Sequence, residues 1–385
     1  MRSVHRGLFW SSLLMASIFA ITGCSFFGVS TPSPHGSAGN RTGAPGSTRM
    51  KVMAFYDQSG SPAGPDPLSL LASHPGLVTE VAPFWYEVEP SGNILSKPQG
   101  NIESLARSQH LKLTPLVTNA GSSDAFLHTA ATRSMAISHI VHLVTSRHYA
   151  GVNIDFQGLK SSDRSHLTAF MTTLDHKMPK GTLVSMSVVP LTSQNGQSSA
   201  YDYAALDRVT NAIVLMAYDL HGDGTPPGPV SPLPWVRRSI QTALQAGISP
   251  QKLYLGIADY GYDWTAGSTK ATTVPVKVMA QARYGHYVWN AADAEGTITY
   301  TTSGVRHTIW FVPAKGAAAR VRLAASYHLG GVAFWRIGYE DASWWKTVAA
   351  ALQNPTGAKT AASRHRTAAP SHPSRSPQHR GRANH

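Results

Sequence analysis

The sequence predicts an α/β fold, a closed (β/α)8 barrel of the TIM-barrel type, with a small α+β insertion between its seventh and eighth strands. Between residues 50 and 352, short apolar runs rich in β-branched residues alternate with longer segments of helical period. This order is typical of a parallel sheet covered by helices. One barrel needs about 250 residues, so the 385-residue chain accommodates it with both ends left over.

Eight apolar runs have the length of buried strands, and a closed barrel of this type needs eight. They are residues 51–56, 80–85, 112–118, 151–156, 183–188, 212–217, 252–257 and 331–335. Segments between most of these runs carry apolar residues at three- and four-residue spacing, which predicts helices. They are residues 102–109, 130–147, 163–177, 201–209 and 236–245.

The stretch between the seventh and eighth runs is too long for a loop that joins a strand to a helix. Threonine-rich and aromatic runs at 287–289, 297–302 and 307–312 predict strands there, and residues 277–284 predict a helix. We therefore expect a small α+β insertion over about residues 265–314.

The net charge of +13 is concentrated at the two ends of the chain. Of the 33 basic residues, ten lie in residues 1–49 and 356–385, which hold no acid. The central part is nearly balanced, with 23 basic and 20 acidic residues. A basic groove for DNA or RNA would need local clustering of cations that the sequence does not show, so we expect no nucleic-acid partner.

The N-terminus resembles a bacterial lipoprotein signal. Arg2 and Arg6 precede an apolar run, and the motif Ile-Thr-Gly-Cys ends at Cys24, the single cysteine of the chain. The run is too short for a comfortable transmembrane span. We expect a signal peptide over residues 1–23, lipid on Cys24 and a domain anchored outside the cytoplasm to the cell membrane. The alternative is a free core cysteine after an ordinary secretory signal.

Two segments have the composition of unfolded chain. Residues 24–49 are rich in Ser, Thr, Gly and Pro, which predicts a flexible linker. Residues 356–385 are basic and rich in histidine, with too little apolar surface to fold. This tail is either a solvated end or a segment that adheres to anionic wall polymer or lipid head groups.

Functional side chains of such a barrel gather at the carboxyl ends of its strands. The residues expected there are aromatic and polar, with few cations. Those proposed for substrate binding are Tyr56, Trp85, Met216, Asp219 and Trp335, together with Asn153. Aromatic faces bordered by hydrogen-bonding groups suit sugar rings, whose C–H faces stack and whose hydroxyl groups need partners.

The fourth strand carries the most specific pattern. Side-chain alternation places Asn153, Asp155 and Gln157 on one face, pointing inward, with the apolar residues between them packed outward. Three polar side chains inside a barrel are costly unless they bond each other or a ligand. The pattern therefore indicates either a ligand site or a structural polar ladder.

These strand-end motifs resemble glycoside hydrolase family 18, the chitinase-like barrels, and within it the spore-germination and cortex-lytic N-acetylglucosaminidase branch. The resemblance covers residues 50–352. The motifs that carry it are APFWY at 82–86, GVNIDFQGL at 151–159, MAYD at 216–219, PGPV at 227–230 with PW at 234–235, LG at 255–256, YGYDW at 260–264 and GGVAFWRIG at 330–338. The family also has an insertion before its eighth strand.

The resemblance implies roles for the fourth strand. The family motif Asp-Gly-x-Asp-x-Asp-x-Glu has its acidic positions at Ala150, Asn153, Asp155 and Gln157 here. In the family the Glu protonates the glycosidic oxygen while the substrate's own N-acetyl group attacks the anomeric carbon. The preceding Asp orients the acetamide, and the Tyr at the place of Tyr218 donates a hydrogen bond to it.

Gln157 has no proton to give, so general acid catalysis is expected to be absent. Gln nearly conserves the volume and reach of Glu, so sugar binding can survive. We expect a protein that recognises a glycan containing N-acetylglucosamine, such as peptidoglycan or a chitin-like polymer, with little or no hydrolysis. The alternatives are a slow hydrolase and a protein-interaction scaffold. The replacement acids that the hydrolase could use are Glu87, Glu89, Asp259, Glu340 and Asp341.

Metal and phosphate chemistry have no support in the pattern. His139 and His142 lie three apart on one predicted helix, more often a solvated face than a metal site. No glycine-rich loop with Lys and Ser or Thr follows a strand. We expect no metal and no other cofactor.

Overall fold

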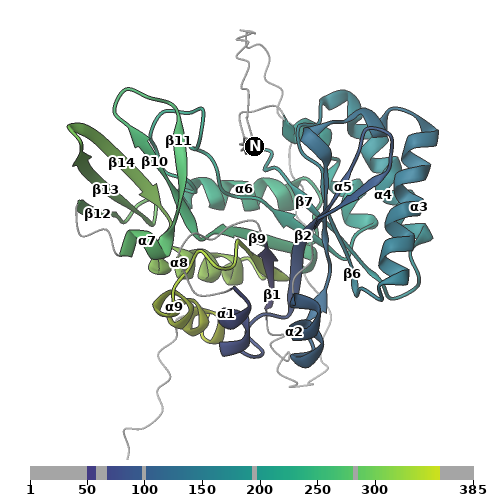
Figure 1. Ribbon diagram of the computed structural model, residues 1–385, viewed down its shortest axis with the longest axis horizontal. Helices are drawn as coiled ribbons and strands as arrows, with labels where there is room; N and C mark the ends of the chain where they lie inside the picture. Colours follow the sequence, from purple (N-terminus) through teal and green to yellow (C-terminus); the bar gives the residue numbers. More distant parts are fainter. Residues whose placement is uncertain (1–49, 58–66, 98–100, 193–196, 281–284, 356–385) are drawn as a thin grey trace, which may run out of the picture.

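The computed structural model describes residues 50–57, 67–97, 101–192, 197–280 and 285–355. The predicted signal peptide, Cys24, the linker over 24–49 and the tail over 356–385 lie outside the described residues. Among those that are described, no helix combines the length and the apolar character needed to cross a membrane. Figure 1 shows a barrel with helices around it and a second, separate sheet beside it.

The barrel consists of eight parallel strands, as predicted. They are β1 (Lys51–Tyr56), β2 (Glu80–Val88), β5 (Leu116–Asn119) with the short β4 (Lys112–Leu113), β6 (Gly151–Asp155), β7 (Leu183–Val188), β8 (Ala212–Leu215), β9 (Leu253–Ala258) and β15 (Gly331–Trp335). Strand β1 pairs with both β15 and β2, which closes the sheet. The short β3 (Ile94–Ser96) adds an antiparallel hairpin to β2.

The predicted third strand, residues 112–118, is broken into β4 and β5. Pro115 lies at the break and has no backbone N–H to give to a neighbouring strand. Next to it, the Thr114 hydroxyl donates to the Glu80 carboxylate at 2.6 Å, inside the barrel. The break leaves the barrel closed, because β5 continues alongside β2 and β6.

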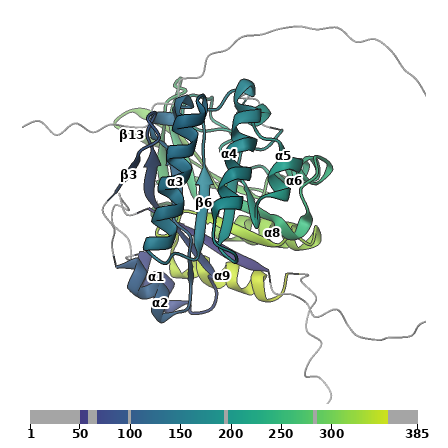
Figure 2. The same cartoon turned by 90° about the vertical axis from the view of Figure 1, so that its right-hand side faces the viewer.

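The helices cover the outside of the barrel. They are α1 (Pro67–Ser73), α2 (Ile102–Ser108), α3 (Ala130–Ser146), α4 (Arg164–Lys177), α5 (Tyr203–Arg208), α6 (Leu233–Gln245), α8 (Ala314–Ser326) and α9 (Ala342–Gln353). The five predicted helices all form, with α6 starting earlier than expected, after Pro232. Figure 2 shows α3 and α4 lying side by side in front of β6.

A five-stranded antiparallel sheet lies between β9 and β15, which confirms the predicted insertion between the seventh and eighth barrel strands. Its strands are β10 (Tyr260–Thr265), β11 (Ala271–Pro275), β12 (His286–Asn290), β13 (Glu295–Thr302) and β14 (Val305–Phe311), in the order β11-β10-β14-β13-β12. The helix α7 (Val276–Ala280) follows β11. Strands β10 and β11 are not among the predicted strands, which begin only at residue 287 in the insertion.

Two groups of apolar side chains form the core. The barrel interior holds a small group of residues, namely Met53, Phe55, Ala82, Leu116, Ala212, Val214, Tyr254 and Ala333. The larger group fills the space between the strands and the helices and includes Val152, Ile154 and Phe156 of the fourth strand. The rings of Phe156, Phe126 and Phe170 meet edge to face in that layer. The outward direction predicted for the apolar side of the fourth strand is therefore confirmed.

Candidate functional site

Asn153 is the lowest polar side chain of the fourth strand and is fully buried. Its amide nitrogen donates to the Ser185 hydroxyl at 2.9 Å, and its amide oxygen accepts from the Ser187 hydroxyl at 3.0 Å. Both serines lie on β7, the neighbouring strand. Asn153 therefore belongs to a satisfied structural network below the site, and the structure does not place it where a sugar could reach.

Asp155 and Gln157 lie above it, at the carboxyl end of β6. The Gln157 side-chain nitrogen donates to both carboxylate oxygens of Asp155, at 2.9 and 3.0 Å. Asp155 is buried and Gln157 is partly exposed. Burial raises the pKa of Asp155 to about 6, against the lowering effect of the Gln157 amide. The two side chains thus form one hydrogen-bonded unit that opens to solvent on the Gln157 side.

The backbone of Gln157 is held by Asn119, at the end of the neighbouring strand β5. The Asn119 side-chain nitrogen donates to the Gln157 carbonyl at 2.7 Å, and its oxygen accepts from the Gln157 N–H at 2.9 Å. One amide side chain therefore satisfies both backbone groups of residue 157. Asn119 is not among the predicted site residues; it ends β5, at the edge of the barrel where functional side chains gather.

Met216 and Tyr218 reach the same place from the end of β8. The Met216 sulfur lies 3.8 Å from the Gln157 side-chain nitrogen. Burial, together with the nearby carboxylate of Asp155, raises the pKa of Tyr218 well above its usual value. Tyr218 is therefore a neutral phenol that can donate a hydrogen bond to a ligand.

Asp219 joins the barrel site to the insertion. Its φ of 59° lies in the left-handed region, which Asp tolerates better than most residues. One of its carboxylate oxygens accepts hydrogen bonds from the hydroxyl groups of Tyr260 and Tyr262, both on β10. The first insertion strand, which the sequence did not predict, therefore contributes two tyrosines beside the site.

Trp335 ends the last barrel strand and is partly exposed. Its ring lies 5.3 Å from that of Phe55, centroid to centroid, at the top of the barrel interior. Phe84 packs against the same interior group. The peptide bond between Trp335 and Arg336 is cis. These aromatic rings form an apolar surface beside the site, and the substrate-binding role of Trp335 stays a prediction.

Two predicted binding residues do not reach this surface. Along β1 the alternation places Phe55 inside the barrel and Tyr56 on the opposite side, where it is 4% exposed. The register of β2 shifts between Phe84 and Tyr86, and Trp85 is 1% exposed, with its ring beside that of Tyr149. The prediction for Tyr56 and Trp85 is therefore corrected: Phe55 and Phe84 take the inward positions.

A second group of acids lies at the same end of the barrel but is closed. Asp259 and Glu340 are both 0% exposed. The Glu340 carboxylate accepts from the Gly338 N–H and from the Trp345 indole, both at 2.8 Å. Burial raises the pKa of Glu340 to about 7, and burial together with Glu340 raises that of Asp259 well above its usual value. Lys277, whose ammonium group donates to the Gly338 carbonyl, lies beside them.

Two of the other acids considered as replacements, Glu87 and Asp341, have structural partners. Glu87 pairs with Lys97 at 2.8 Å. Asp341 caps α9, where its carboxylate accepts from the Trp344 N–H at 2.8 Å. Among these acids the structure shows none with a hydrogen bond to Asp155 or Gln157.

A cluster of charged groups fixes the loops on either side of β6. The His128 ring nitrogen lies 3.1 Å from the Asp163 carboxylate, and the Lys160 ammonium lies 2.8 Å from the Asp124 carboxylate. The three ligand-type side chains Asp124, His128 and Asp163 lie close enough to hold a metal ion. Because the Lys160 cation already pairs with Asp124, we interpret the cluster as an ion-pair network.

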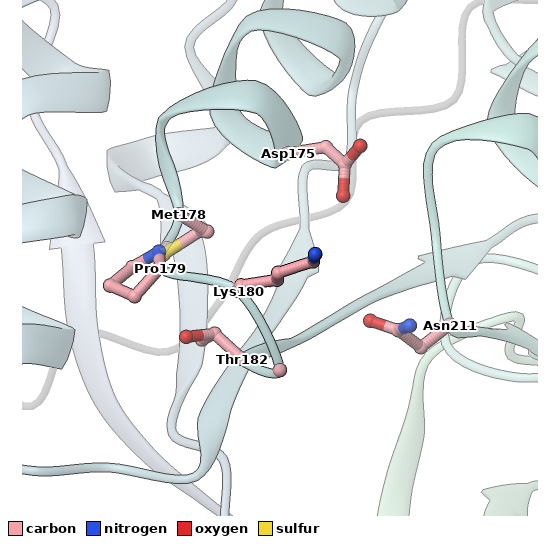
Figure 3. Close-up of a pocket in the computed structure, with 7 residues that line it drawn as sticks. Asp175, Met178, Pro179, Lys180, Thr182 and Asn211 are labelled. Atoms are coloured by element: carbon pink, nitrogen blue, oxygen red, sulfur yellow. The ribbon is translucent and has the colours of Figure 1, made fainter.

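A surface hollow of about 320 Å³ lies at the opposite end of the barrel. Figure 3 shows Asp175, Met178, Lys180 and Asn211 around it. Asn211 precedes β8, and its side-chain oxygen accepts from the Val184 N–H at 2.7 Å. The hollow is thus at the amino ends of the strands, away from Asp155 and Gln157, and the function of such barrels resides at the other end.

Comparison with known proteins places these features in a family. Residues 51–340 match the family model described as Glycosyl hydrolases family 18. A cortical fragment-lytic enzyme of Bacillus subtilis is 27% identical over 290 residues, which are 70% of this chain and 66% of the relative. This chain thus spans about two thirds of the length of that relative.

Solved structures agree with this assignment. A chitinase from Chromobacterium violaceum has a TM-score of 0.71 and 25% identity, and the match covers 78% of this chain and 98% of that one. The spore cortex-lytic enzyme SleL of Bacillus cereus has a TM-score of 0.70 and 24% identity, with 78% of this chain and 73% of that chain covered. The barrel predicted from the alternation of strands and helices is therefore confirmed, and so is the family resemblance predicted from the strand-end motifs.

Proposed function

This chain belongs to glycosyl hydrolase family 18, and from that premise we propose that it binds a glycan containing N-acetylglucosamine while hydrolysing it little or not at all. The glycans proposed are peptidoglycan and chitin-like polymers. The observation that carries the proposal is the side chain of Gln157, which stands where the resemblance expects the proton donor. An amide cannot supply general acid catalysis, which is worth roughly 10²- to 10⁴-fold in rate.

The surroundings of Gln157 support retention of binding. Asp155 and Tyr218 stand where the resemblance expects the two groups that hold the N-acetyl group. The Asp155 carboxylate is fixed by the Gln157 amide at 2.9 and 3.0 Å, and Tyr218 is a neutral donor. The half-buried face of Trp335 supplies an apolar surface for a sugar ring. A site with these groups can recognise the sugar without a proton donor for the glycosidic oxygen.

A slow hydrolase that uses another acid is the second candidate. Asp259 and Glu340 have the raised pKa values that a proton donor needs. Both are fully buried, and Glu340 is held by two hydrogen bonds. A proton donor has to reach the leaving oxygen within hydrogen-bond distance, so the closed position of these acids disfavours this candidate. A scaffold with an empty pocket is the third.

The test compares the purified parent protein with a Gln157→Glu variant on N-acetylglucosamine oligomers and on purified peptidoglycan. Binding and released reducing ends are followed in the same samples. In the variant two carboxyl groups would lie at hydrogen-bond distance and share one proton, which raises the pKa of one of them toward that of a general acid. We expect binding without release in the parent and release in the variant.

Turnover by the parent that survives a Gln157→Leu change would overturn the proposal and favour the hydrolase that uses another acid. A parent protein that neither binds nor cleaves any of these glycans would favour the scaffold. Trp335→Ala serves as the control for the pocket, because loss of the apolar surface should abolish binding while leaving Gln157 in place.

We further propose that lipid on Cys24 anchors the protein outside the cytoplasm to the cell membrane and that the tail over 356–385 contacts anionic wall polymer or lipid head groups. The lipoprotein motif before Cys24 and the six basic residues of the tail support this arrangement. Labelling of growing cells with a fatty-acid analogue should mark the parent and leave a Cys24→Ser variant unlabelled. Truncation at residue 355 should reduce retention on anionic wall material without changing the labelling.

A further inference from the structure

We infer that Gln157 is a self-deamidation site, at which water hydrolyses the side-chain amide with the Asp155 carboxyl as the proton carrier. The product is a glutamate at position 157. That this product restores a proton donor for sugar hydrolysis rests on the proposed function, but the modification itself does not. The protein would then change from a glycan-binding form to a hydrolytic one by a reaction of its own site.

The geometry brings the leaving group and the proton carrier together. The Gln157 side-chain nitrogen lies 2.9 and 3.0 Å from the two carboxylate oxygens of Asp155. The Asn119 side chain fixes the Gln157 backbone through two hydrogen bonds, at 2.7 and 2.9 Å. Gln157 is partly exposed, so water reaches its amide, whereas Asp155 is only 5% exposed.

The reaction balances with water as the single co-reactant. The water oxygen forms a bond to the side-chain carbonyl carbon of Gln157, and the water proton passes to the Asp155 carboxylate. Asp155 returns that proton to the side-chain nitrogen, the carbon–nitrogen bond breaks, and ammonia leaves. Burial raises the pKa of Asp155 to about 6, which allows this carboxyl to accept and return a proton near neutral pH.

A second route to the same change depends on sequence alone. Gly158 follows Gln157, and a backbone nitrogen that follows Gln can attack the side-chain amide and form a cyclic imide, which opens to two differently linked glutamates. The chain holds a built-in control for this route, because Gln99 is also followed by glycine, Gly100. Asn195 with Gly196 offers a positive control for the assay. All four of these control residues lie outside the described part of the structure.

The experiment incubates the purified protein at neutral pH and follows each site by peptide mass spectrometry, which detects the replacement of NH2 by OH. We expect Gln157 to convert about 10²-fold faster than Gln99, the low end of the gain from a positioned acid–base group. The Asp155→Asn variant should lose this advantage. Parent protein unfolded in urea should lose it as well, because the amide then no longer lies beside the carboxyl group.

Equal rates at Gln157 and Gln99 in folded protein would overturn the inference, as would conversion of Gln157 at an unchanged rate in Asp155→Asn. If the Asp155→Asn variant does not fold, the comparison of folded parent with parent unfolded in urea provides the test. Hydrolysis of N-acetylglucosamine oligomers, followed in the same samples, separates the two proposals. If Gln157 converts to glutamate but the converted protein does not hydrolyse the oligomers, the deamidation is supported and the restored activity is contradicted. If the Gln157→Glu variant hydrolyses the oligomers but Gln157 of the parent does not convert, the restored activity is supported and the deamidation is contradicted.

Discussion

The acids at this end of the barrel are all buried, but they differ in whether a partly exposed side chain lies against the carboxyl group. Asp155, at the end of β6, is hydrogen-bonded to the partly exposed side chain of Gln157. Asp259 and Glu340, after β9 and β15, are fully buried beside Lys277. Burial raises the pKa of the acids in both groups.

The difference shows that a raised pKa does not identify a reactive acid by itself. Perturbed acids occur in structural networks as well as in functional sites. Glu340 receives hydrogen bonds from Gly338 and Trp345 and helps to hold the segment after β15. Asp155 is hydrogen-bonded to one amide side chain, that of Gln157, which is partly exposed. We therefore expect substitutions at Asp259, Glu340 and Lys277, the closed group, to change the stability of the fold. Substitutions at Asp155 and Gln157 should change the affinity for the ligand.

The largest expected effect is on stability, from Lys277→Met in the closed group. The change removes a cation that lies near both buried carboxyl groups, of which Asp259 also lies near Arg336. It also removes the hydrogen bond from the Lys277 ammonium to the Gly338 carbonyl, and the loss of a hydrogen bond that involves a charged group costs up to about 3 kcal/mol. Urea unfolding at pH 8 measures the loss in free energy of unfolding. Lys346→Met is the control, because Lys346 is exposed on α9. A cost for Lys277→Met no larger than that of the control would show that the closed group needs no cation.

The Asn119→Ala change should have an intermediate effect. It removes the side chain that satisfies the Gln157 N–H and carbonyl, and a buried group left without a partner costs about 1–3 kcal/mol. We expect lower stability in urea unfolding and weaker binding of N-acetylglucosamine oligomers in calorimetry. The Asn119→Asp change keeps the oxygen that accepts from the Gln157 N–H and removes the nitrogen that donates to the Gln157 carbonyl. Its loss of stability and of binding should therefore be smaller. Unchanged binding by the Asn119→Ala variant would show that the two hydrogen bonds from Asn119 do not position Gln157 for the ligand.

The Asp155→Asn change should separate stability from binding. At pH 8 the buried carboxylate is ionised at a cost, since one unit of pKa shift corresponds to about 1.4 kcal/mol. We expect the free energy of unfolding to stay equal or to rise by up to about 2 kcal/mol, while the affinity for N-acetylglucosamine oligomers falls about tenfold. A large loss of stability would instead place Asp155 with the closed group.

The smallest effect is the pH dependence of stability. Burial raises the pKa of Glu340 to about 7, so the folded protein binds its proton more tightly than the unfolded chain does. Stability is then gained as the pH falls through 7 and is complete below the ordinary pKa of Glu. From pH 8 to 6 this carboxyl should contribute about 1.4 kcal/mol. In thermal or urea unfolding, the Glu340→Gln variant should lack this gain in stability between pH 8 and 6. A pH profile of stability equal to that of the parent would contradict the raised pKa of Glu340.

Local patterns predicted much of the fold and part of the site. The alternation along residues 151–157 placed Asp155 and Gln157 on the inner face, and the structure agrees. The same rule failed at β2, where a register shift between Phe84 and Tyr86 turns Trp85 outward. It left open whether Asn153 binds a ligand or a structural network, and the structure shows Asn153 hydrogen-bonded to Ser185 and Ser187. The pattern along a single strand does not predict a register shift or the side chains of the neighbouring strand.

The sequence alone determined the order of the eight barrel strands and of five helices between them, the inward face of the fourth strand and the presence of Gln157 in the place of an acid. These properties depend on residues that are neighbours in the chain, because side-chain alternation and helical period are local. Only the tertiary structure decided that Asn119 holds the Gln157 backbone, that Tyr260 and Tyr262 bond Asp219, and which buried acid lies beside a partly exposed side chain. Those properties depend on register and packing between segments far apart in the chain, which no local pattern encodes.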